Sequence, residues 1–209
     1  MQYDNINAAK GDLMMPGYVL TNFIVYAIVN AFTPGPGNIL ALNTVTNYGW
    51  KKGKPLFSGI FTGYYVVQII CAVFVYGVGT FLPDVLRVMK YIGVVYILWL
   101  AIHIAISKPE ISEEQRSASF MKGFLLQFVN VKIYMFGITA LTGFITPYSK
   151  AMWTLIGFEL LIATIGTIAT STWIGAGILI QNFYIKHYRI INIILALTLL
   201  ECIWSMLQT

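Results

Sequence analysis

The sequence TPGPGN, residues 33–38, interrupts an apolar run that extends from Tyr18 to Val45. Two prolines and two glycines within four residues cannot continue a regular helix, because proline lacks a backbone donor and glycine adds backbone freedom. In a bilayer, backbone groups released from a helix are tolerated only inside the protein or beside a watered cavity. The segment therefore predicts a broken membrane helix, and the break is either a packing kink or a substrate site.

The composition predicts an integral membrane protein that forms one transmembrane domain over residues 1–209. The 209 residues are 58% hydrophobic and 10% charged, and the mean hydropathy is +0.75. A soluble domain carries roughly 25% charged residues. The net charge of +5 is dispersed, which does not indicate a nucleic-acid partner. Cys71 and Cys202 lie singly in apolar runs, and no His or Cys residues have metal-ligand spacing, so we expect no metal or cofactor.

Prolines at the edges of the apolar runs divide the chain into six expected transmembrane helices. These helices cover residues 17–46, 55–82, 84–107, 120–146, 151–181 and 187–206. The loops after the first, third and fifth helices hold most of the positive charge, which places them in the cytoplasm and both termini outside. The positive residues concerned are Lys51, Lys52, Lys54, Lys108, Arg116, Lys122, Lys186 and Arg189.

The helix layout predicts an internal repeat. An offset of 96 residues superimposes the start of the second expected helix on the start of the fifth, and it places Pro34 over Asn130. We expect two three-helix repeats at about 17–107 and 120–207, joined by a cytoplasmic linker at 108–119. Three helices per half give the halves opposite orientations. Helices one and four are then both interrupted, as in transporters with inverted repeats and a central site.

Two charged residues are expected near the middle of the membrane. Lys132 lies about 18 Å along the fourth helix, so it needs a carboxylate, carbonyls, water or an anionic substrate, unless it extends to the interface. Asn130 beside it can bond released backbone groups or a ligand. Glu159 lies roughly 13 Å into the fifth helix. It is predicted to neutralise Lys132, to carry a proton or to contact a substrate ammonium; a purely structural ion pair is the alternative.

Small and polar residues share one face of the fifth expected helix at spacings of three and four, and we expect that face to point inward. Its members are Glu159, Ala163, Gly166, Thr170, Trp173 and Gly177. Gln68 and Tyr65 of the second helix are weaker candidates for the transport path. The sequence contains no GxSxG, HExxH, P-loop or GxGxxG motif, so neither an enzyme nor an ATP-driven pump is expected.

The segment TPGPGNILALNTVTNYGWKKG, residues 33–53, resembles the first-helix signature of the lysine exporter (LysE/RhtB) family of bacterial amino-acid exporters. KGFLLQFVNVK, residues 122–132, resembles the family's fourth-helix motif, which usually ends Asn-Pro-Lys; here Val131 replaces the proline. The resemblance implies efflux of amino acids or close derivatives, driven by the proton gradient, across a bacterial plasma membrane. The expected transport path comprises Pro34, Gly35, Pro36, Gly37, Asn38, Asn130, Lys132, Glu159 and Trp173.

Two other functions are compatible with these patterns. A membrane interaction or assembly protein would tolerate changes at both breaks, and an ion or metal exporter could share the architecture. The expected partners are an amino acid and the lipid bilayer. Gly59 and Gly63 can pack helices closely within the chain or between two copies in a homodimer. The patterns do not specify the amino acid or the coupling ion.

Overall fold

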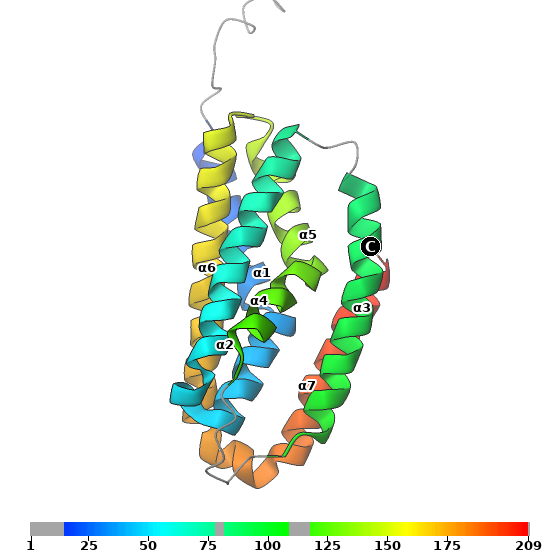
Figure 1. Cartoon of the computed structure of the whole chain (residues 1–209). Coiled ribbons are helices and arrows are strands. Elements are labelled where there is room, and N and C mark those ends of the chain that lie inside the picture. Colours follow the sequence, from blue (N-terminus) through cyan, green and yellow to red (C-terminus); the bar gives the residue numbers. More distant parts are fainter. Residues whose placement is uncertain (1–14, 78–81, 109–117, 209) are drawn as a thin grey trace, which may run out of the picture.

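The computed structural model describes residues 15–77, 82–108 and 118–208, and every regular element in these ranges is helical (Figure 1). This confirms the all-α class. The elements are α1 (Gly17–Phe32), α2 (Pro36–Gly77), α3 (Leu82–Ile106), α4 (Phe120–Val129), α5 (Val131–Ala140), the π-helix η2 (Leu141–Ile145), α6 (Met152–Leu179) and α7 (Gln181–Gln208).

The first expected helix is broken where the sequence predicted, but the boundary after it was wrong. Residues between α1 and α2 are non-helical, and α2 then continues past Gly49 to residue 77. Gly49 has φ 75° and ψ 171°, a conformation that favours glycine and divides α2 into two helical segments. The ribbon of α2 reverses direction along its length (Figure 1). The second segment thus begins at Trp50, and Pro55, which was expected to start it, lies inside the helix.

The fourth expected helix is also interrupted, at Asn130. Its φ and ψ are −85° and 85°, and the segments 120–129 and 131–145 are bent by 56° relative to each other. The last two expected helices are joined more directly than predicted, because α7 starts at Gln181. Only His187, with φ −124° and ψ 22°, interrupts it, at the position where the sixth helix was expected to begin.

The helices pack in two groups. α2 makes its main contacts with α6 and α4, whereas α3 packs chiefly on α7, and this pair lies to one side of the others (Figure 1). An apolar cluster that includes Ile39, Leu42 and Val131 joins the α3–α7 pair to the breaks. Gly59 of α2 faces the backbone of α4. This glycine therefore serves close packing within the chain.

Within the described residues, three helices are long and apolar enough to cross a membrane: Pro36–Gly77, Met152–Leu179 and Gln181–Trp204. The bent pair Phe120–Val129 and Val131–Ile145 forms a fourth candidate, and Gly17–Phe32 and Tyr91–Ile106 are shorter apolar helices. Large apolar side chains such as Val95, Leu179 and Ile190 are exposed on these helices. The model thus supports a multi-pass membrane protein, while the count of six crossings stays a prediction.

Candidate functional site

The end of α1 is held by side chains from other helices. Proline at 34 and 36 stops the helix, so carbonyl groups in its last turn need new donors. Asn38 Nδ2 donates to the Ala31 carbonyl at 2.9 Å, and Trp173 Nε1 donates to the Phe32 carbonyl at 3.2 Å. The first break is therefore stabilised by α2 and by α6.

The ammonium of Lys132 binds the next two carbonyl groups. Its Nζ donates to Thr33 O at 3.0 Å and to Pro34 O at 3.2 Å. Lys132 lies two residues beyond Asn130, so these hydrogen bonds join the second break directly to the first. The two interruptions, almost a hundred residues apart in sequence, meet in space.

The predicted inward face of α6 is confirmed. Glu159, Thr170 and the small residues of that face are buried, and Trp173 is half-buried. Thr170 Oγ1 donates to Asn38 Oδ1 at 2.7 Å. Asn38 thus bonds α1 through its amide nitrogen and α6 through its oxygen, which fixes its side chain beside the break.

The second break presents unpaired acceptors. Asn130 is buried, and its Oδ1 has no hydrogen-bond partner. Gln127, one turn earlier, is also buried; its Nε2 donates to Gly123 O at 3.3 Å and its Oε1 has no partner. The sequence analysis missed Gln127. A second amide one turn before Asn130 on the same apolar helix was the signal that could have indicated it.

A small cavity of about 30 Å³ lies where these side chains meet. Residues from both breaks line it, including Gly35, Gly37, Asn38, Asn130 and Lys132. Sites for small organic ligands usually enclose roughly 300 Å³ or more. In this structure the cavity is therefore too small to hold a ligand of that size.

Four expected site residues are not part of this cavity lining: Pro34, Pro36, Glu159 and Trp173. Trp173 acts through the Phe32 carbonyl, and Glu159 does not pair with Lys132. Both carboxylate oxygens of Glu159 lack hydrogen-bond partners. The carboxylate close enough to act electrostatically on Lys132 is the exposed Glu201 of α7. Of the partners that the sequence left open for Lys132, the structure thus shows backbone carbonyls and not the carboxylate of Glu159.

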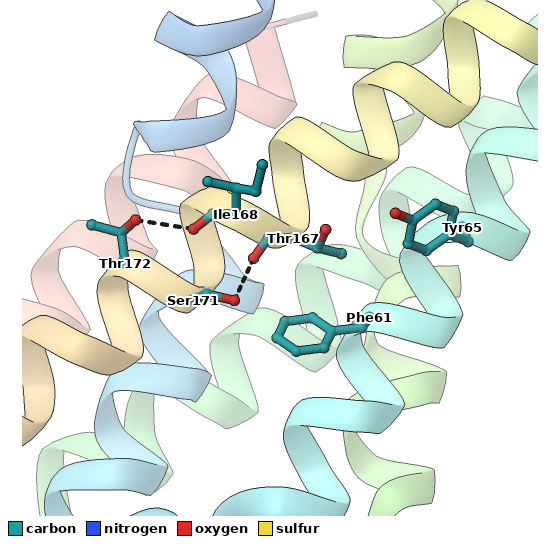
Figure 2. A pocket seen from close by; sticks show the side chains of 6 residues that line it. All are labelled: Phe61, Tyr65, Thr167, Ile168, Ser171 and Thr172. Carbon is teal, nitrogen blue, oxygen red and sulfur yellow. Dashed lines mark hydrogen bonds between the residues drawn. The ribbon is translucent and has the colours of Figure 1, made fainter.

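A larger hollow of about 500 Å³ lies on the outer side of α2 and α6 (Figure 2). It is lined by Phe61, Tyr65, Thr167, Ile168, Ser171 and Thr172. The hydroxyls of Ser171 and Thr172 donate to carbonyls of their own helix, and Tyr65 bonds Thr164 across the helix pair. These groups are already paired, and Tyr65 lies on this outer face instead of the central cavity that was expected for it.

A buried polar network around Tyr184 of α7 also escaped the sequence analysis. Tyr184 is fully buried; its hydroxyl donates to Asn192 Oδ1 at 2.8 Å and lies 3.2 Å from Asn47 Oδ1. Asn192 Nδ2 donates to Ser107 O at 2.9 Å. The network connects α2, α3 and α7 at one end of the helices.

Broken helices that meet at a small polar cavity, inside an otherwise apolar bundle, define a multi-pass membrane transporter. The model of the LysE type translocator family matches residues 28–202, and the chain belongs to this family. It is a transporter, and not an enzyme.

Curated relatives cover nearly the whole chain. A protein of Salmonella choleraesuis named cysteine/O-acetylserine efflux protein is 40% identical over 190 residues, which are 90% of this chain and 97% of the relative. Proteins of the same name from Escherichia coli O139:H28 and Shigella flexneri are 37% and 36% identical and cover 88% and 90% of this chain, and 95% and 97% of their own length. No solved structure matches the chain.

Proposed function

We propose that this protein exports cysteine, O-acetylserine or a closely similar amino acid from the cell. Membership of the LysE type translocators and the names of the relatives support amino-acid export. The two named cargoes share a zwitterionic backbone and a short uncharged side chain. A site for them needs one cation and several hydrogen-bond acceptors.

The observation that carries the proposal is that one cavity is lined both by the ammonium of Lys132 and by two amide oxygens that have no hydrogen-bond donor. The ammonium of Lys132 binds the cargo carboxylate after it leaves the carbonyls of Thr33 and Pro34. Asn130 Oδ1 and Gln127 Oε1 accept no hydrogen bond in this structure, and they accept hydrogen bonds from the cargo ammonium. The cavity therefore complements both charges of a zwitterion.

In the proposed architecture, the protein is an inverted repeat that crosses a bacterial plasma membrane six times. Each half contributes one broken helix, and Lys132 connects the two breaks. Such a site at the junction of two halves suits alternating access, in which the closed cavity opens to one side at a time. The export is driven by the proton gradient. Assembly of two copies into a homodimer stays a prediction.

The test compares Lys132→Ala with Lys122→Ala. Both lysines belong to the α4–α5 region, but Lys122 is exposed and does not line the cavity. Loss of a charge-assisted hydrogen bond to the cargo costs about 1.5–3 kcal/mol, so Lys132→Ala should slow efflux by at least about tenfold. Lys122→Ala should export normally.

The measurement is internal and external cysteine and O-acetylserine in cells that carry each variant, with the membrane amount of protein verified. Dipeptide feeding raises the internal pool for the comparison. Normal efflux from Lys132→Ala would remove Lys132 from the cargo site. Absence of any export by the unaltered protein, for every amino acid supplied, would overturn the proposed cargo class.

A further inference from the structure

Gln68 of α2 and Glu159 of α6 form a second polar cluster beside Gly137 of α5. Both side chains are fully buried, and none of their four polar atoms has a hydrogen-bond partner. A Cβ at Gly137 would lie 2.8 Å from Gln68 Oε1 and 2.8 Å from Glu159 Oε1. Gln68 Oε1 and Glu159 Oε1 are therefore separated by at most twice 2.8 Å. The missing side chain of Gly137 lets the amide and the carboxyl approach each other.

Among the described residues, no positively charged group acts electrostatically on the carboxyl of Glu159. The titratable groups close enough for Glu159 to act on them are Tyr26 of α1 and Tyr64 and Cys71 of α2. Apolar residues such as Ile133 and Ile162 pack in the same region. An unpaired charge in such a setting is costly, which favours the protonated form of the carboxyl.

We propose that Glu159 and Gln68 bind the proton that is coupled to export, at a site separate from the cargo cavity. One carboxylate oxygen of Glu159 takes up a proton from one side of the membrane and releases it to the other. Gln68 is a positioning residue: its amide oxygen accepts from the protonated acid, and its amide nitrogen donates to the carboxylate. A single amide can thus serve both protonation states.

The cluster is close enough to the cargo cavity to influence it. Tyr64 and Gly166 line the cavity, and the Tyr64 hydroxyl lies 2.8 Å from a Cβ built on Gly166. Tyr64 also interacts electrostatically with Glu159, which shares the inward face of α6 with Gly166. Tyr64 therefore lines the cavity and is also within electrostatic range of the Glu159 carboxyl. This inference rests on the proposed function for its coupling role, while the proton site itself does not depend on the cargo.

The first experiment uses purified protein in lipid vesicles with radiolabelled O-acetylserine, and it separates exchange from driven transport. Exchange of internal for external cargo needs no net proton movement, whereas accumulation against a gradient does. Glu159→Gln should still exchange label but should lose accumulation driven by an imposed pH difference. Gly137→Ala should weaken accumulation as well, because its methyl group would collide with both side chains.

The matched control for Gly137→Ala is Gly143→Ala, since a Cβ at Gly143 meets nothing within 4 Å. This control should accumulate cargo like the unaltered protein. Undiminished pH-driven accumulation by Glu159→Gln would overturn the proposal. Equal loss of exchange and accumulation by a folded Glu159→Gln protein would also overturn it, because that result assigns the carboxyl to cargo binding or packing.

A second measurement separates failure of this inference from failure of the proposed cargo. The infrared carbonyl band of a protonated carboxylic acid can be recorded for the lipid-embedded protein without any cargo. The unaltered protein should show such a band at neutral pH, and Glu159→Gln should lack it. No difference between the two spectra would overturn the proton site, even if export of O-acetylserine were established. Conversely, the band could persist in a protein that fails to export O-acetylserine, and only the cargo would then be wrong.

Discussion

The contact between α2 and α4 provides the sharpest stability prediction. Gly123 of α4 approaches the backbone of α2 so closely that a Cβ would lie 2.2 Å from Leu56 O and 2.9 Å from Ile60 N. Gly59 mirrors it, with a Cβ only 2.1 Å from Phe120 O. Both obstructing partners are backbone atoms, which cannot rotate out of the way. We expect Gly123→Ala to force the two helices apart by about 1 Å.

The expected change in the free energy of unfolding for Gly123→Ala follows from two opposing effects. Overpacking at a close contact costs typically 1–3 kcal/mol, and a rigid backbone partner places this site at about 3 kcal/mol. Alanine in place of glycine within a helix returns roughly 0.5–1 kcal/mol. The net loss is therefore about 2 kcal/mol in the free energy of unfolding, or roughly a 30-fold lower ratio of folded to unfolded protein.

The assay is reversible unfolding in mixed micelles by increasing SDS, followed by the helical circular dichroism of the purified protein. Gly157→Ala of α6 is the control, because Gly157 is exposed and a Cβ there meets nothing within 4 Å. Its stability should stay equal or rise by up to about 1 kcal/mol. A Gly123→Ala protein as stable as the unaltered chain would refute the argument that glycine is needed for this approach.

Removing a hydrogen bond that joins two helices should lower the free energy of unfolding more than removing one within a single helix. Thr170→Val removes the donor to Asn38 and leaves a buried acceptor unpaired, so it should lower the unfolding free energy by about 1–3 kcal/mol. Thr172→Val, whose hydroxyl bonds only its own helix, should change it by less than about 0.5 kcal/mol. Tyr184→Phe should cost about 1–3 kcal/mol by the same unfolding assay, because it removes a buried hydroxyl from its network. Tyr188→Phe, whose hydroxyl contacts only the adjacent arginine, should be nearly neutral. Equal effects within either pair would contradict the assigned contacts.

The positions of both breaks could be predicted from the sequence because their causes are local. Pro34 and Pro36 lack the backbone N–H groups needed to continue the hydrogen bonds of α1, and a polar Asn130 close to Lys132 inside an apolar run indicates a membrane-depth site. The offset of 96 residues placed Pro34 over Asn130, and the structure has a helix break at each of them, while the inverted repeat itself stays a prediction. Their meeting in space follows once two such segments must hide their polar groups from lipid.

Helix boundaries were less predictable because they depend on backbone conformation more than on residue type. Pro55 is a strong punctuation signal, yet the helix begins after Gly49, whose positive φ divides α2 into two segments. A proline can be accommodated inside a helix at the loss of one hydrogen bond, whereas a left-handed glycine interrupts the helix. His187 is a milder case, since its φ of −124° bends α7 without ending it.

The sequence left several partners open for Lys132, for a general physical reason. A charge inside a membrane needs compensation, which a carboxylate such as Glu159, backbone carbonyls, water or an anionic substrate could each supply. A helix break, however, supplies carbonyl oxygens that have lost their own donors, and Lys132 binds two of them at Thr33 and Pro34. These carbonyl oxygens accept hydrogen bonds from the ammonium of Lys132, so Lys132 does not need a carboxylate beside it. Glu159 is consequently free of Lys132, and an unpaired carboxyl in an apolar bundle is suited to bind and release a proton.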